Sequence, residues 1–123
     1  MKCLIVDDSA TMRRILVNAM KSIGFSNIVE AGDGKEALDR IDAEIGLVIT
    51  DWNMPVMGGL ELVRALRARE DTARMPVLMV TTRSGKEDIL EAVTAGVNSY
   101  ILKPFTPPVL KEKIDQLLAT AAG

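Results

Sequence analysis

Residues 2–8 read KCLIVDD, in which four consecutive apolar residues lead directly into two aspartates. Short apolar runs that are rich in β-branched residues and bounded by polar residues predict buried strands. Four similar runs follow along the chain. The predicted strands are Lys2–Val6, Asn27–Glu30, Leu47–Thr50, Val77–Val80 and Ser99–Leu102. A segment with helical periodicity follows each strand, so the sequence predicts five βα units.

The helical segments carry recognisable start and stop signals. The clearest apolar helix face is formed by Met12, Ile15, Leu16, Ala19, Met20 and Ile23. Gly24 is a suitable C-terminal stop for that helix. Asp33 and Ser84 each stand three residues before a glutamate, which predicts N-terminal caps for the second and fourth helices. Thr106, followed by a proline, predicts the start of the fifth.

Strict alternation of apolar strands and helices predicts an α/β fold, in which a doubly wound, five-stranded parallel sheet is covered by five helices on its two faces. The length of 123 residues fits one such domain. We therefore expect residues 1–123 to form a single domain, with residues 119–123 frayed at its end.

Composition excludes several classes of function. The net charge of -2 gives no general attraction to nucleic acid or anionic membranes, and the first apolar run is too short for a signal sequence or a membrane span. We expect a cytoplasmic protein with a buried, unreactive Cys3. The absence of histidine removes the commonest general base. A basic run near the chain's middle predicts a solvated helix end rather than a nucleic-acid patch; it comprises Arg64, Arg67, Arg69 and Arg74.

Polar residues stand where the predicted strands end. Asp7 and Asp8 follow the first strand, Asp51 the third, Thr81 the fourth and Lys103 the fifth. Ligand sites in open parallel sheets lie beyond these carboxyl ends. The aspartate pair alone is typical of a solvated turn or a helix cap, but its coincidence with polar residues at the other strand ends favours a site.

Three converging carboxylates repel one another unless a hard cation lies among them. Mg²⁺ suits oxygen ligands, and the sequence offers no soft ligand set for zinc or copper. A carboxylate can attack phosphorus once the repulsion between anions is removed, and an ammonium, a hydroxyl and Mg²⁺ are sufficient for that purpose. The pattern therefore indicates phosphoryl transfer to an aspartate.

The chain resembles the response-regulator receiver family over essentially its whole length. The resemblance rests on the acidic pair 7–8, the run DWNMP at 51–55, Gly59, Thr81 and the run KPF at 103–105. Within the family it is greatest to the single-domain chemotaxis members, and the stretches that carry it are 11–14, 51–55, 77–81 and 103–106. It implies a flavodoxin-like strand order of 2-1-3-4-5 and a cis peptide bond between Lys103 and Pro104.

The resemblance also implies the roles of the acidic residues. Asp51 would be the phosphoacceptor. Asp8 would bind Mg²⁺ directly, and Asp7 would act mostly through water. The backbone carbonyl of Asn53 and the Asp51 carboxylate would complete the protein ligands of the metal.

The remaining roles concern the phosphoryl group and signalling. Lys103 and Thr81 would contact the phosphoryl group, and Tyr100 would be an aromatic switch that follows Thr81. A sensor kinase phosphohistidine would be the donor, and a flagellar motor switch protein the output partner. The expected partner surface comprises Lys86, Ile89, Tyr100 and Lys113. We expect a monomer that catalyses only its own phosphorylation and dephosphorylation.

Three residues depart from the commonest family pattern. Gly58 precedes Gly59 where an acidic or amide residue is usual, Thr82 is larger than the frequent alanine or glycine, and Arg83 adds a charge near the site. The last two affect access to the phosphoryl group and its lifetime. Trp52 is either a packing aromatic or part of the site, and the seven methionines are typical of core filling.

Other functions use a similar fold or similar residues. A haloacid-dehalogenase phosphatase would need an aspartate at the position of Asn53, and the chain is short for one. A flavodoxin-like FMN protein would need phosphate-binding hydroxyls and amides where Asp7 and Asp8 stand. A phosphorelay receiver that passes its phosphate to another histidine protein, or a receiver detached from a transcription factor, stays open. Because only residues 119–123 follow the last helix, we expect output through a noncovalent partner.

Overall fold

The computed structural model describes residues 1–122, which alternate strictly between strand and helix. The strands are β1 (Lys2–Val6), β2 (Ile28–Ala31), β3 (Ile45–Thr50), β4 (Val77–Thr81) and β5 (Ser99–Leu102). The helices are α1 (Ala10–Ser22), α2 (Gly34–Arg40), α3 (Gly59–Ala68), α4 (Lys86–Ala95) and α5 (Pro107–Ala122). The predicted strands are confirmed to within two residues at each end.

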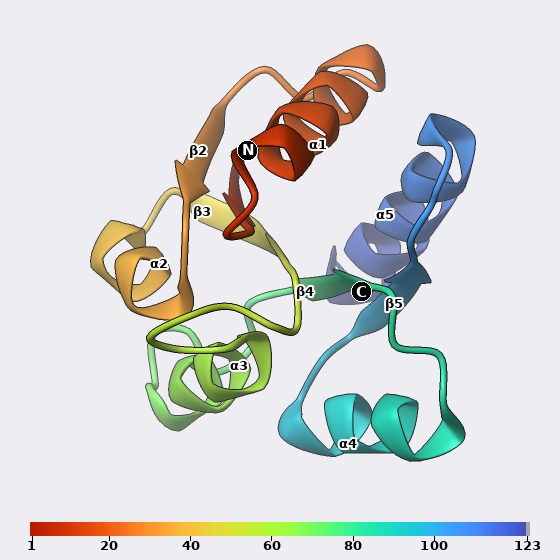
Figure 1. Cartoon of the computed structure of the whole chain (residues 1–123). Coiled ribbons are helices and arrows are strands. Elements are labelled where there is room, and N and C mark those ends of the chain that lie inside the picture. The colour runs from red at the N-terminus through yellow and green to blue at the C-terminus, as the bar shows by residue number, and fades with distance from the viewer. Residues whose placement is uncertain (123) are drawn as a thin grey trace.

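All five strands are parallel and lie in the order β2-β1-β3-β4-β5, which confirms the expected order. Val6 at the end of β1 is paired with Ala31 of β2 and Thr50 of β3, so these strands end level with one another. Helices α1 and α5 cover one face of the sheet, and α2, α3 and α4 cover the other (Figure 1). The fold is therefore doubly wound.

The two faces of the sheet are filled by alternate residues of the same strands. In β1, Cys3 and Ile5 belong to the core beneath α1 and α5, whereas Leu4 and Val6 belong to the core beneath α2, α3 and α4. All four side chains are fully buried. Burial raises the pKa of the Cys3 thiol to about 12, so this thiol stays protonated and unreactive at neutral pH.

The helix caps agree only in part with the sequence. The Asp33 carboxylate accepts a hydrogen bond from the Glu36 N–H at 2.8 Å, which confirms the predicted cap of α2. The predicted Ser84 cap is wrong, because α4 begins one residue later with Gly85 at the N-cap and no side-chain cap. The Asp88 carboxylate in the first turn pairs with Arg83 instead.

Two side chains do not lie where periodicity and charge predicted. Ile15 was expected on the apolar face of α1 but is 48% exposed. Arg67 was expected in a solvated basic run, but its guanidinium donates to the carbonyl of Gly96 and to the side chain of Asn98, both at 2.8 Å. It also donates to the carbonyls of residues 72 and 73. Backbone carbonyls of two loops and the Asn98 side chain therefore hold Arg67 in place.

Residues 119–123 are expected from the sequence to fray. Helix α5 continues to Ala122, whereas Gly123 lies outside the described residues. Among residues 1–122, no helix is both long enough and apolar enough to cross a bilayer.

Candidate functional site

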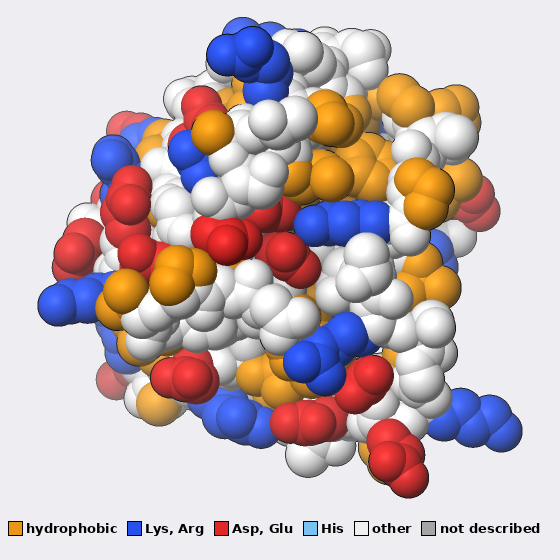
Figure 2. Space-filling view, viewed as in Figure 1, with side chains coloured by type: hydrophobic (Ala, Val, Ile, Leu, Met, Phe, Trp, Pro, Cys, Tyr) orange, Lys and Arg blue, Asp and Glu red, His pale blue; other side chains and the backbone are white. Residues whose placement is uncertain are grey.

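An acidic cluster lies where β1 and β3 end. Carboxylate oxygens of Asp7, Asp8 and Asp51 all lie within 4.8 Å of one another. Asp7 is buried, Asp51 is half-buried and Asp8 is exposed. Acidic side chains gather beside a basic side chain on the face shown in Figure 2. The parallel strands thus bring together carboxylates that are more than 40 residues apart in the sequence.

Lys103, which follows β5, completes this cluster. Its ammonium nitrogen lies 3.1 Å from Asp7 Oδ2 and 3.2 Å from Asp51 Oδ2. The Lys103 side chain is only 14% exposed, so these ion pairs are partly shielded from water. The backbone N–H of Lys103 donates a hydrogen bond to the Thr81 carbonyl at 2.9 Å. The peptide bond between Lys103 and Pro104 is cis, as the resemblance implies.

Asp7 is held in place by its immediate neighbours. The Ser9 N–H donates to Asp7 Oδ1 at 2.9 Å, and Arg13 Nη1 donates to the Asp7 carbonyl at 2.6 Å. Neither contact is predicted above from the sequence. The aspartate itself, at the end of a predicted strand, is a signal for the first, because aspartate side chains commonly accept a hydrogen bond from the backbone N–H two residues on.

Asp51 is oriented by two donors. Its Oδ1 accepts a hydrogen bond from the Trp52 N–H at 2.6 Å, while Oδ2 faces Lys103. Burial raises the pKa of the Asp51 carboxyl above its ordinary value; the Trp52 N–H and Lys103 oppose this change and Asp7 reinforces it. A half-buried carboxylate with fixed oxygens is well placed to act as a nucleophile.

A tight turn of residues 51–59 carries Asp51 into α3. The Gly59 N–H donates to the Trp52 carbonyl at 2.8 Å, and a Cβ atom on Gly59 would lie only 2.1 Å from the Asp51 carbonyl oxygen. Val56 at the tip of the turn has a φ angle of 66°, which is strained for a β-branched residue. Backbone packing therefore fixes the position of Asp51.

The other predicted site residues lie around this cluster. Thr81 is buried at the end of β4, and its hydroxyl oxygen accepts a hydrogen bond from the Arg83 N–H at 3.3 Å. Asn53 is exposed in the turn after β3. Tyr100 of β5 is half-buried, and its hydroxyl donates to the Arg83 carbonyl at 2.7 Å. Tyr100 thus lies beside the site and makes no hydrogen bond to the acidic cluster among the described residues.

The predicted partner surface lies on α4, β5 and α5. Lys86 and Ile89 are exposed on α4, whereas Lys113 and Tyr100 line a cleft of about 280 Å³. Apolar side chains that the sequence analysis did not name extend this surface. They are Leu90 and Val93 on α4 and Leu102 on β5, which are 66%, 59% and 43% exposed.

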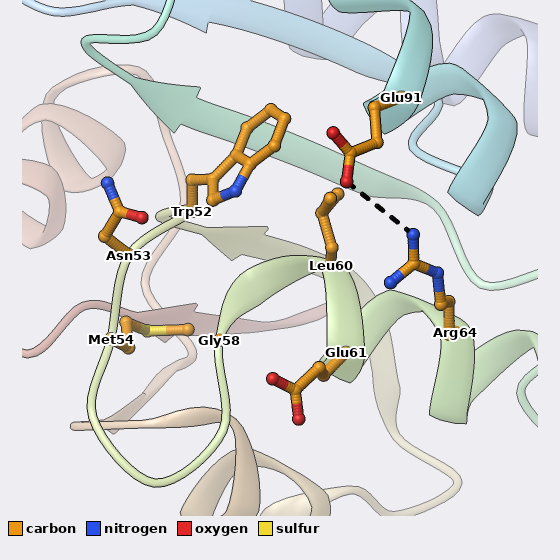
Figure 3. Close-up of a pocket in the computed structure, with 8 residues that line it drawn as sticks. All are labelled: Trp52, Asn53, Met54, Gly58, Leu60, Glu61, Arg64 and Glu91. Carbon is orange, nitrogen blue, oxygen red and sulfur yellow. Dashed lines mark ion pairs between the residues drawn. The ribbon is translucent and has the colours of Figure 1, made fainter. Parts of the chain in front are cut away.

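Trp52 has a packing role, since it is 8% exposed and belongs to the core beneath α2, α3 and α4. It also borders a cavity of about 350 Å³ between the turn after β3, α3 and α4 (Figure 3). Arg64 of α3 and Glu91 of α4 form an ion pair of 3.9 Å on the cavity's border. Met20 and Met79 are fully buried, as expected of core methionines, whereas Met1 is 65% exposed and does not fill the core.

The acidic cluster is compatible with a bound divalent cation. The cluster holds three carboxylates but one ammonium group, Lys103, which pairs with Asp7 and Asp51, so negative charge is in excess. The side-chain atoms that could bind a metal are all carboxylate oxygens, which are hard ligands. The Asp8 carboxylate makes no hydrogen bond or ion pair with the rest of the described chain. These residues therefore fit a hard divalent cation.

Comparisons with known proteins agree on one family. Residues 3–115 match the response regulator receiver domain. A chemotaxis protein CheY homolog of Campylobacter jejuni is 50% identical over 125 residues, covering 100% of this chain and 96% of the relative. The chemotaxis protein CheY of Pseudomonas aeruginosa is 49% identical over 124 residues, covering all of both chains.

Solved structures give the same result. The chemotaxis response regulator CheY4 of Vibrio cholerae superposes with a TM-score of 0.87 at 34% identity, covering 94% of this chain and 97% of that chain. A putative response regulator from Chloroflexus aurantiacus superposes with a TM-score of 0.89 at 30% identity, covering 96% and 97% of the two chains.

Proposed function

This chain belongs to the response regulator receiver domain family of two-component signalling proteins, and we propose that it accepts a phosphoryl group on Asp51 and signals by a change of shape. The observation that carries the proposal is the position of the Lys103 ammonium, 3.1 Å from Asp7 and 3.2 Å from Asp51 at the rim of the sheet. Lys103 lowers the charge around Asp51, which otherwise repels an incoming phosphoryl group.

The donor we propose is a phosphohistidine of a sensor kinase. An oxygen of the Asp51 carboxylate attacks phosphorus, the new O–P bond forms, and the P–N bond to the donor imidazole breaks. The imidazole nitrogen keeps the electron pair of that bond and takes up a proton. Lys103 and the Thr81 hydroxyl would contact the phosphoryl oxygens, so the chain contributes positioning and charge rather than a general base.

Mg²⁺ would be held by the carboxylates of Asp8 and Asp51 and the carbonyl of Asn53, with Asp7 acting mainly through water. When bound, the ion neutralises charge on the carboxylates and on the phosphoryl oxygens. Asp7 differs from the other two aspartates in being fully buried, with its two oxygens bonded to Lys103 and the Ser9 backbone N–H. Asp8 is exposed and has its carboxylate available for the metal.

This difference predicts unequal effects of the two aspartates on Mg²⁺ affinity. Asp8→Asn should raise the dissociation constant by about tenfold or more, whereas Asp7→Asn should raise it by less, because a direct charged ligand contributes more than one acting through water. Trp52 fluorescence during Mg²⁺ titration is the measurement, since Trp52 is next to Asp51 and its backbone N–H donates a hydrogen bond to the Asp51 carboxylate. Equal losses in the two variants, or a larger loss for Asp7→Asn, would contradict the assignment.

The proposed output surface comprises Lys86, Ile89, Tyr100 and Lys113. Thr81 and Lys103 stand at the ends of β4 and β5, so a phosphoryl group that draws both inward also moves the elements joined to them. A ligand shifts such an equilibrium only by its difference in affinity for the two states, and a shift to a mostly active state requires about 3–5 kcal/mol. One hydroxyl and one ammonium contact made only after phosphorylation are sufficient.

The partner we propose is a flagellar motor switch protein, because relatives of about 50% identity are chemotaxis proteins. Exposed apolar residues on α4 beside lysines suit a short amphipathic segment of such a partner. In this role the protein works as a monomer in the cytoplasm. It would bind neither nucleic acid nor a membrane.

Amide chemical shifts with Mg²⁺ and beryllofluoride, which mimics the phosphoryl group, test the proposal. We expect the shifts of residues 81–113 to change in the wild type. Thr81→Ala should still bind the mimic at Asp51 but lose most of the change around Tyr100, because its hydroxyl contact is gone. Changes confined to α2 and α3 would show that the output surface is wrong, and no change at all would refute the phosphoacceptor site.

A further inference from the structure

Arg13 of α1 connects the loop that carries Asp7 and Asp8 to the end of β2. Its Nη1 donates to the Asp7 carbonyl at 2.6 Å, and its Nε donates to Glu30 Oε1 at 3.3 Å. A guanidinium is a rigid, planar fork, so its two bonds fix the distance between the groups that accept them. Arg13 therefore ties the loop after β1 to the neighbouring strand.

The Asp7 carbonyl lies where the sheet no longer supplies a hydrogen-bond donor. Asp7 follows the last residue of β1, and its N–H still donates to the Ala31 carbonyl at 3.1 Å. Among residues 1–122, no neighbouring strand donates to the Asp7 carbonyl oxygen, and Arg13 takes that place. A hydrogen bond from a charged donor is stronger than one between neutral groups, so this contact holds the carbonyl firmly.

A fixed Asp7 carbonyl also orients Asp8. The carbonyl of residue 7 and the N–H of residue 8 lie in one rigid peptide plane, so a bond to that oxygen sets the direction in which the chain enters Asp8. The exposed Asp8 side chain makes no hydrogen bond or ion pair of its own within the described residues. Its carboxylate nevertheless lies within 4.8 Å of those of Asp7 and Asp51. The backbone alone therefore places this carboxylate in the acidic cluster.

We propose that Arg13 is a positioning residue for the metal site. It orients the peptide plane between Asp7 and Asp8 and so keeps the Asp8 carboxylate beside the other two. The Glu30 contact contributes less, because 22% of the Arg13 side chain and 49% of the Glu30 side chain are exposed, and exposed ion pairs are weak. Residues that hold the ligands commonly set the affinity of a metal site. This inference rests on the proposed binding of Mg²⁺.

The charge of Arg13 has the opposite effect to its positioning role. A guanidinium near the acidic cluster repels Mg²⁺, so removing the charge without any change in geometry should tighten Mg²⁺ binding. Removing the contact that orients Asp8 should weaken it. The sign of the change in Mg²⁺ affinity therefore separates the two effects.

The test is the Mg²⁺ dissociation constant of the whole chain, measured by Trp52 fluorescence and by calorimetry. Arg13→Ala should raise this constant about threefold to tenfold, because residues that hold metal ligands have effects of about tenfold or more and Arg13 acts on the backbone instead of on a ligand side chain. Arg13→Lys keeps the charge and one donor and should give a smaller increase. Glu30→Gln should also give a smaller increase.

Arg14→Ala is the matched control. Arg14 carries the same charge on the next residue of α1, but it is exposed and makes no hydrogen bond or ion pair with the rest of the described chain. Its Mg²⁺ dissociation constant should equal that of the wild type or be lower. In the double variant of Arg13→Ala and Glu30→Gln, the constant should equal that of Arg13→Ala, because Glu30 acts through Arg13.

Urea unfolding separates positioning from stability. Each variant is unfolded in excess chelator and again at one fixed Mg²⁺ concentration. A merely structural role of Arg13 would lower both stabilities equally and leave the gain on adding Mg²⁺ unchanged. A positioning role should reduce that gain, because the gain depends on the ratio of the Mg²⁺ concentration to the dissociation constant.

An unchanged or lower dissociation constant for Arg13→Ala would overturn the positioning role. An increase of the same size for Arg14→Ala would also overturn it, since the effect would not be specific to Arg13. If the wild type does not bind Mg²⁺, the proposed metal site fails and this inference fails with it. If the wild type binds Mg²⁺ and Asp8→Asn weakens binding while Arg13→Ala does not, the metal site stands and the role of Arg13 alone is wrong.

Discussion

Asp51→Asn is expected to abolish covalent labelling by acetyl phosphate or by a phosphorylated sensor kinase. An amide has no carboxylate oxygen to attack phosphorus, so the loss should be complete rather than partial. The asparagine oxygen can still accept the hydrogen bond that the Trp52 N–H donates to Asp51, at 2.6 Å in the native protein, and the fold should therefore survive. Intact-mass measurement after incubation with Mg²⁺ and the donor is the readout.

The control for this experiment is Asp71→Asn. Asp71 is an exposed carboxylate paired with Arg69 at 2.9 Å, far from the strand ends that form the site, and its loss should leave labelling at the wild-type level. Label that persists at another residue of Asp51→Asn would refute Asp51 as the sole phosphoacceptor. Full labelling of the wild type in excess chelator would show that the transfer does not need Mg²⁺.

The sequence alone was sufficient to predict the sheet and much of the acidic cluster. Cys3 to Val6 form a continuous apolar run because both faces of β1 are covered by helices, and that pattern is characteristic of parallel sheets. Carboxyl ends of parallel strands share one edge, so Asp7, Asp51 and Lys103 were expected to meet. The distances of 3.1 and 3.2 Å from Lys103 to the two aspartates show that they do.

The order of the strands could not be predicted from local patterns. Apolar periodicity shows that a segment is a strand but not which strand lies beside it, and the order 2-1-3-4-5 came only from the resemblance. The predicted Ser84 cap is wrong because the local pattern does not show which tertiary contacts the first turn of the helix makes. The spacing of Ser84 and Glu87 satisfies the cap pattern, but the pairing of Asp88 with Arg83 belongs to a helix that begins one residue later.

The arginines show most clearly what local patterns miss. Arg67 and Arg83 stand among polar residues, as solvated arginines commonly do. Nothing in the neighbouring sequence shows that their guanidinium groups differ in their contacts from that of exposed Arg64. Arg67 is held by the Gly96 carbonyl, and Arg83 by Trp52 and Asn53, all of which are about 30 residues away in the sequence. Such partners are defined only when the fold brings together the loops at each end of the sheet.

Gly59→Ala is expected to have the largest effect of any single methyl group added near the site. A Cβ atom on Gly59 would lie 2.1 Å from the Asp51 carbonyl oxygen and 3.0 Å from the Met79 methyl group. The closer neighbour is backbone, so the turn of residues 51–59 itself must shift. The hydrogen bond that the Gly59 N–H donates to the Trp52 carbonyl, at 2.8 Å, opposes that shift. We expect a loss of about 3 kcal/mol or more in the free energy of unfolding, at the upper end for an overpacked site.

The same shift should displace the Asp51 carboxylate from Lys103, so the folded fraction of Gly59→Ala should also be labelled more slowly than the wild type. Urea unfolding measures the stability, and labelling at low temperature measures the second effect. Gly32→Ala is the matched control, because a Cβ there meets only the side chains of Glu36 and Arg13, at 3.6 and 3.7 Å, which is ordinary contact. Its stability should change by less than about 1 kcal/mol. Equal stabilities of the two alanine variants would mean that the turn yields easily and that backbone packing at Gly59 does not fix the position of Asp51.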